Sequence, residues 1–167
     1  HHSDRVAAMA VVLARVLHLS EDDTTTVQVA AFAHDIGKIS MSDAVLRKAG
    51  PLTDAEWEEM RRCPVTGYDI LRKVPQFHRG ALIVRHHHKR WDGRGYPDQL
   101  AGTAIPLGAR IIAVADSIDA MMSNRSYRPA MTATVCHHEI EKNSGVMYDP
   151  QVVAAAMNCW EELVSRY

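Results

Sequence analysis

The sequence contains few cysteines, carries almost no net charge and has no long apolar run. It holds only three cysteines, an odd number, so no disulfide framework is expected and a reducing, cytoplasmic setting is predicted. The formal net charge is -1, so no overall field draws the chain to polymeric nucleic acid or to an anionic membrane. No apolar run approaches the length of a membrane span, so we expect no membrane contact from this segment. Any anionic ligand must therefore be held by local charges.

Strand-type alternation and internal repeats are also missing, and helical periodicity takes their place. A chain of 167 residues, 47% of them hydrophobic, can bury one core but not two. Apolar spacing, capping residues and breaks at proline or glycine predict a single all-α domain over 1–167. The first residues have helical character without a start signal, so we expect a fragment of a larger regulatory protein. The predicted helices cover 6–17, 24–36, 54–62, 63–73, 77–88, 107–122, 132–142 and 150–164.

Three consecutive histidines, at 86–88, run directly into a turn rich in arginine, glycine and aromatic residues. Histidine is the commonest metal ligand, and a glycine-rich backbone beside arginines can approach phosphates closely. The stretch 86–97 therefore predicts a metal site next to a phosphate or base contact. A solvated histidine tract is the alternative unless further ligands are found elsewhere in the chain.

Two other predicted helices supply such ligands. His34 and Asp35 end one helix beside an alanine-rich face, and Asp116 lies inside the most apolar helix, where an unpaired carboxylate would be costly. A hydrogen-bonded His–Asp pair and an Asp–Arg salt bridge are the structural alternatives. Mixed nitrogen and oxygen donors suit iron, manganese, zinc or nickel, and two such ions close together are the usual arrangement for in-line attack on phosphorus. The pattern predicts hydrolysis of a phosphoester.

Basic residues around and after the histidine run give a local positive excess. Guanidinium and ammonium groups are the usual partners of phosphate, so this excess fits a phosphate-bearing ligand even though the whole chain is nearly neutral. A solvated basic surface is the alternative for individual members. The residues are Arg85, Lys89, Arg90, Arg94, Arg110, Arg125 and Arg128.

Several motifs, in one order, give the chain a specific resemblance to a known family. Over about 2–153 it closely resembles the HD-GYP group of HD-domain phosphohydrolases. The resemblance implies a helical HD core with additional C-terminal helices, and metal-dependent hydrolysis of cyclic di-GMP to pGpG or GMP in bacterial signalling. The motifs are His34-Asp35-Ile36-Gly37-Lys38, His87-His88 with Arg90-Trp91-Asp92-Gly93-Arg94-Gly95-Tyr96-Pro97, Ile105-Pro106-Leu107, Asp116-Ser117-Ile118-Asp119-Ala120 and Arg125-Ser126-Tyr127-Arg128.

The resemblance also implies a role for each matching position. Asp35 resembles a ligand that bridges two metals and Lys38 a lysine beside the scissile phosphate, so these two are the expected catalytic residues. About two divalent transition metals are implied, iron or manganese ahead of zinc or nickel. The expected metal ligands are His2, His34, Asp35, Cys63, His87, His88 and Asp116. The expected substrate contacts are Tyr96, Asp119, Arg125 and Arg128.

The chain departs from the family pattern at two readable positions. Cys63 stands where the family has a histidine ligand, and it is either a thiolate ligand or a small apolar residue. Lys89 stands where the family usually has glutamate, and its charge is expected to weaken metal binding. The family glutamate associated with a third metal would precede residue 1. The alternative to an enzyme is therefore a degenerate domain that binds cyclic di-GMP, or a cyclase, with little or no turnover.

Partners are implied by the same resemblance. Cyclic di-GMP is the expected ligand, and the Gly95-Tyr96-Pro97 loop is a candidate docking site for a diguanylate cyclase of the GGDEF type. Family members commonly follow a receiver or sensor domain, so such a domain is expected upstream. A homodimer is compatible with the sequence, which does not fix the oligomeric state.

Overall fold

The chain folds as an all-α protein. The computed structural model describes residues 1–125 and 127–167; Ser126, in the motif at 125–128, lies outside the described residues. Within them are nine α-helices and three short 3₁₀ helices, and the only β-pairing is in isolated bridges. The predicted fold class is thus confirmed. In the part of the chain that is described, none of the helices has the length and apolar character needed to cross a membrane.

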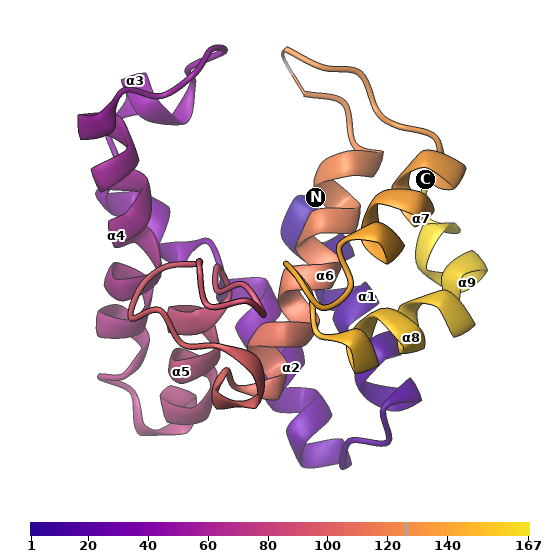
Figure 1. The fold of residues 1–167 in the computed structure, drawn as a ribbon. Helices are drawn as coiled ribbons and strands as arrows, with labels where there is room; N and C mark the ends of the chain where they lie inside the picture. The colour runs from indigo at the N-terminus through magenta and orange to yellow at the C-terminus, as the bar shows by residue number, and fades with distance from the viewer. Residues whose placement is uncertain (126) are drawn as a thin grey trace.

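Four helices form the centre of the molecule. α1 packs against α2 and α6, and α2 packs in turn against α5 (Figure 1). Each of them buries an apolar face, with Leu13 of α1, Ala31 of α2, Val84 of α5 and Ile118 of α6 fully buried. Burial of one such aliphatic side chain contributes about 1.5–3 kcal/mol, so this shared core holds the four helices together. Their bounds are His2–Val16 for α1, Glu21–Ala33 for α2, His78–His86 for α5 and Leu107–Met122 for α6.

The remaining elements flank this centre on two sides. α3 and α4 stand on one side of Figure 1, and α7, α8 and α9 stand on the other. Met41, which follows η1, Val45 of α3 and Cys63 of α4 form a small apolar cluster of their own, separate from the main core. The bounds are η1 Ile36–Ser40, α3 Asp43–Leu46, α4 Asp54–Leu71, η2 Pro75–Phe77, η3 Gly102–Ala104, α7 Ala133–Lys142, α8 Pro150–Asn158 and α9 Trp160–Val164.

A buried ion pair ties α8 to α6. Arg110 Nη1 donates to Asp149 Oδ2 at 2.6 Å, and Arg110 Nε donates to the carbonyl of Ile105 at 2.9 Å. The other oxygen of Asp149 accepts from the backbone N–H of Gln151 and so caps α8. The guanidinium of Arg110 is therefore committed to a structural pair, and it does not contribute to the local positive excess that the sequence indicated.

Three predicted helix boundaries are wrong. α4 continues through Pro64, which removes only the one hydrogen bond to the carbonyl of Met60, while packing against α5 and η1 holds the helix on both sides. The helix predicted over 150–164 is divided at Cys159, whose N–H and thiol both donate to the carbonyl of Ala155. α2 ends at Ala33, so His34 and Asp35 follow the helix rather than lie within it.

Gly37 sets the distance between η1 and α4. A Cβ atom at this position would lie 1.8 Å from the carbonyl oxygen of Cys63 and 2.7 Å from its carbon. Only glycine permits such a close approach of two backbones. The contact brings the segment that carries Asp35 and Lys38 against the middle of α4, next to Cys63.

We expect Gly37→Ala to destabilise the protein by about 3 kcal/mol, because backbone atoms of α4 cannot move aside as a flexible side chain would. Gly50→Ala is the matched control, since nothing lies within 4 Å of a Cβ at Gly50. Urea unfolding of both variants checks this. Equal midpoints for Gly37→Ala and Gly50→Ala would show that the backbones do not approach closely.

Candidate metal centre

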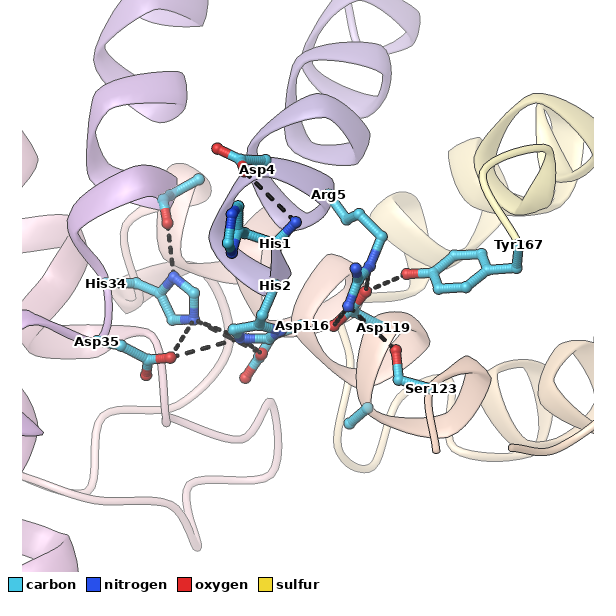
Figure 2. A network of polar contacts seen from close by, with 12 residues as sticks. His1, His2, Asp4, Arg5, His34, Asp35, Asp116, Asp119, Ser123 and Tyr167 are labelled. Carbon is cyan, nitrogen blue, oxygen red and sulfur yellow. Dashed lines mark hydrogen bonds and ion pairs between the residues drawn. The ribbon is translucent and has the colours of Figure 1, made fainter. Parts of the chain in front are cut away.

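Side chains from four segments meet at one place in the interior. His2 comes from the first turn of α1, His34 and Asp35 follow α2, Asp116 lies in the middle of α6, and His87 follows α5. Figure 2 shows His2, His34, Asp35 and Asp116 pointing toward one another across the interfaces between three of these segments. The expected ligands are thus brought together by the packing of α1, α2, α5 and α6.

Four of these residues form a compact set of donor atoms. His2 Nε2 lies 3.4 Å from Asp35 Oδ2 and 3.1 Å from Asp116 Oδ1. His34 Nε2 lies 3.4 Å from Asp35 Oδ2, 3.6 Å from Asp116 Oδ1 and 3.3 Å from His2 Nε2. Two imidazole nitrogens and two carboxylate oxygens therefore face one small volume, which is the mixed donor set that divalent transition metals prefer.

Backbone carbonyls fix the tautomers of His34 and His87. Nδ1 of His34 lies 2.6 Å from the carbonyl oxygen of Ala31, and Nδ1 of His87 lies 2.6 Å from that of Val84. A carbonyl only accepts, so Nδ1 of each ring carries the proton and donates it. The lone pair of each Nε2 is left free to bind a metal.

His87 and His88 form a second part of the site. Nε2 of His87 is buried and has no hydrogen-bond partner among the described residues. The His87 ring lies 5.3 Å from the ring of His34 and 3.9 Å from that of His88. A cavity of about 100 Å³ is bordered by both histidines and by Asp116. A buried lone pair without a partner, beside such a cavity, fits a metal ligand.

The two parts differ in charge. Hydrogen bonds with Asp116, Asp119 and Asp35 raise the pKa of His2 to about 11. Burial would raise the pKa of Asp35 and of Asp116, but hydrogen bonds with His2 hold both below their usual range. Burial lowers the pKa of His87 and His88. One part therefore contains two ionised carboxylates paired with His2, and the other offers neutral imidazoles.

Lys38 and Tyr96 border the site as expected. Nζ of Lys38 lies 3.2 Å from Asp35 Oδ2, and its side chain is 43% exposed, so it stays reachable from solvent. The ring of Tyr96 stacks on His88, with 5.1 Å between ring centroids. The loop that carries Tyr96 is held by hydrogen bonds from the N–H groups of Trp91 and Asp92 to the carbonyls of Met147 and Val146.

Two of the expected substrate contacts have other partners. The Asp119 side chain is 1% exposed, and its carboxylate is engaged by His2, Arg5 and Tyr167. Arg128 Nη2 donates to the carbonyl of Ala120 at 2.8 Å, near the end of α6. This geometry favours structural roles for Asp119 and Arg128, whereas Arg125 is exposed and available.

Cys63 lies beside the site without joining its compact donor set. Its thiol packs in the small cluster of α3 and α4 and lies 3.8 Å from the carbonyl of Glu59. Burial raises the pKa of Cys63, which favours the neutral thiol over the thiolate that binds metals. The sequence left Cys63 open as either a thiolate ligand or a small apolar residue, and this geometry supports the small apolar residue.

The local positive excess is largely neutralised. Arg85 pairs with Asp98, and Arg90 pairs with Asp92. Lys89 is 4% exposed and burial lowers its pKa, so it presents no ammonium group to solvent. Of the seven basic residues, Arg94 and Arg125 are the ones that lie exposed.

Sequence reasoning missed Arg5 and Tyr167. Both contact Asp119, and Arg5 lies one helical turn after His2, on the same face of α1 (Figure 2). That spacing is a signal for Arg5. Tyr167 lies far from the other residues in the sequence and carries no comparable signal.

Comparisons with known proteins agree with the fold and the motifs. A family model described as HD domain matches residues 1–152. The chain is 42% identical to "Cyclic di-GMP phosphodiesterase response regulator RpfG" of Xanthomonas campestris pv. campestris over 92% of this chain and 41% of that protein. It is 40% identical to "Cyclic di-GMP phosphodiesterase" of Thermotoga maritima over 99% of this chain and 46% of that protein. The chain spans less than half the length of these relatives.

A solved structure shares the fold. The HDGYP protein Bd1817 of Bdellovibrio bacteriovorus superposes with a TM-score of 0.78 over 96% of this chain and 52% of that chain, at 15% identity. Together with the motifs at 34–38 and 87–97, these matches show that the chain belongs to the HD domain family and, within it, to the HD-GYP group.

Proposed function

We propose that this domain is a metal-dependent phosphodiesterase that hydrolyses cyclic di-GMP to pGpG or GMP. The observation that carries the proposal is the convergence of His2, His34, Asp35 and Asp116, whose donor atoms face one point from three helical segments. The names of the two relatives above support cyclic di-GMP as the substrate.

The donor set fits divalent transition metals. His2, His34, Asp35 and Asp116 would hold one ion, and His87 and His88 would contribute to a neighbouring one, with iron or manganese ahead of zinc or nickel. Such ions, when bound, stabilise phosphate charge and activate water for in-line attack on phosphorus.

The chain's own residues then position the substrate and handle charge. Lys38, held by Asp35, places an ammonium group at the open edge of the site, where it stabilises charge on the scissile phosphate and can give a proton to the leaving oxygen. Tyr96, stacked on His88, offers its ring to a guanine base. Arg125, exposed in the loop after α6, contacts a phosphate.

The second proposed metal position, at His87 and His88, has fewer donor atoms than the family pattern provides. Cys63 supplies a buried neutral thiol where the family has a histidine, so the second ion keeps His87 and His88 but loses a donor. We propose that the second ion binds more weakly than the first. The lost donor is the basis of the alternative, a domain that binds cyclic di-GMP with little turnover, but the names of the two relatives support the enzyme.

Partners beyond the nucleotide follow the family. We propose that the loop at 95–97 docks a GGDEF cyclase, that a receiver or sensor domain lies upstream, and that the assembly is a homodimer. The loop is fixed to 146–147 by backbone hydrogen bonds and so presents a defined surface.

Hydrolysis should depend on Asp35. Purified protein loaded with Fe(II) or Mn(II) under reducing conditions is expected to convert cyclic di-GMP to pGpG. Asp35→Ala is expected to lower the rate at least about 100-fold, more than loss of an outer-shell partner does, because it removes a proposed metal ligand and also the carboxylate that holds Lys38. Chromatography of the products measures this, with 3′3′-cGAMP as the comparison substrate.

Asp69→Ala is the matched control, since Asp69 forms an exposed pair with Arg72 and should leave the rate unchanged. Binding of cyclic di-GMP without conversion under any metal would overturn the enzyme proposal and leave the binding domain. Faster hydrolysis of 3′3′-cGAMP than of cyclic di-GMP would overturn the proposed substrate but would support the proposed phosphodiesterase reaction.

The two substitutions of Cys63 should affect the metal content differently: histidine should raise it and alanine should leave it unchanged. Cys63→His is expected to raise the number of metal ions per domain and the hydrolysis rate together, because it restores an imidazole donor. Cys63→Ala is expected to leave the metal content unchanged, because the thiol is not a ligand. Mass spectrometry of the metals in both variants measures this, and a loss of metal in Cys63→Ala would instead make the thiol a ligand.

A further inference from the structure

Three histidines of the centre have Nδ1 held in place, but not in the same way. For His34 and His87 the acceptor is a backbone carbonyl three residues earlier in the chain. For His2 it is a carboxylate from another helix: Nδ1 lies 2.5 Å from Asp119 Oδ2 of α6. A carboxylate only accepts when ionised, so Nδ1 of His2 carries the proton and Nε2 faces the other ligands. The orientation of His2 therefore depends on the position of Asp119.

Asp119 is itself held by two further residues. Arg5 Nε donates to Asp119 Oδ1 at 2.6 Å, and Arg5 Nη2 donates to Oδ2 at 3.3 Å. The hydroxyl of Tyr167 also donates to Oδ1. Figure 2 shows Arg5 and Tyr167 reaching this carboxylate from α1 and from the C-terminal end of the described chain.

Arg5 and Tyr167 also hold each other. The guanidinium of Arg5 lies over the Tyr167 ring, with 5.6 Å from its central carbon to the ring centroid, and Nη2 donates to Ser123 Oγ at 3.3 Å. A buried carboxylate with both oxygens occupied has little freedom to rotate. The hydroxyl of Tyr167 thus lies between Asp119, to which it donates, and the guanidinium of Arg5.

We propose that Arg5 and Tyr167 are positioning residues that act through Asp119 to hold the Nε2 of His2 toward the metal. This proposal rests on the proposed function, in which His2 is a ligand. Tyr167 then links the chain after α9 to the metal centre. A carboxylate behind a ligating histidine fixes its tautomer and increases its basicity, and loss of such a partner costs 10–100-fold in metal affinity.

The competing interpretation is a purely structural contact that fastens the last residues to α6. The two interpretations differ in what changes when the hydroxyl is removed. A structural contact changes the stability of the metal-free protein, whereas a positioning contact changes the affinity and the coordination geometry of the bound ion.

The test uses Co(II), whose visible absorption reports ligand geometry, titrated into the chain under reducing conditions with a competing chelator. Tyr167→Phe is expected to weaken Co(II) binding about 10-fold and to alter the absorption bands, at the low end of the range for outer-shell partners because Arg5 still holds Asp119. Asp119→Asn is expected to weaken it more, up to about 100-fold. Tyr68→Phe is the matched control, since the Tyr68 ring contacts Arg72 and Arg85 away from the centre, and it should match the wild type.

Co(II) affinity and spectrum of Tyr167→Phe equal to those of Tyr68→Phe would overturn the proposal, whatever the change in thermal stability of the metal-free protein. A wild-type chain that binds no Co(II) would overturn the metal centre itself, and this proposal with it. Weakened binding with unchanged thermal stability of the metal-free protein would support positioning over a structural contact.

Discussion

The interior of this domain is organised around two carboxylates that α6 carries into an apolar core. Asp116 and Asp119 are three residues apart and so share a face of the helix. A buried carboxylate without a partner costs several kcal/mol, and α1 supplies partners with the same spacing, His2 and Arg5. The crossing of α1 and α6 is thus fixed by complementary charge as well as by apolar packing. The crossing also places His2 beside Asp116. The contacts that give the α6 carboxylates their partners are therefore the same ones that assemble the candidate metal centre.

The ends of α2 and α5 complete the centre by a shared device. The last carbonyls of a helix have no N–H donor within the helix. His34 and His87 each follow directly after a helix and donate Nδ1–H back to one of these carbonyls, those of Ala31 and Val84. The same bond satisfies the helix end and sets the tautomer that a ligand needs.

Much of the centre could be predicted from the sequence because its residues belong to motifs with fixed local spacing. The candidate ligands His34, Asp35, His87 and Asp116 are of this kind. The partners of a charged residue are not local, and for that reason the sequence does not indicate what Arg110 and Arg128 bind. Their guanidiniums bind Asp149 and a helix-end carbonyl, choices that only the packing of distant helices decides.

Helix boundaries follow the same rule. From local sequence preference alone, a proline predicts a break in a helix. α4 nevertheless continues through Pro64, because packing on two sides outweighs the loss of one hydrogen bond. Tyr167 shows the limit most clearly. It lies 48 residues from Asp119 in the chain, and no periodicity or motif connects the two positions.

The two departures from the family pattern act on the neutral part of the centre, and burial decides how. Burial raises the pKa of the Cys63 thiol and lowers the pKa of the Lys89 ammonium, so it favours the uncharged form of both groups. The Nζ atom of Lys89 is buried without a hydrogen-bond partner among the described residues, and the expectation that its charge weakens metal binding stays a prediction. The proposed weaker binding of a second ion therefore rests on the absence of an imidazole donor at position 63.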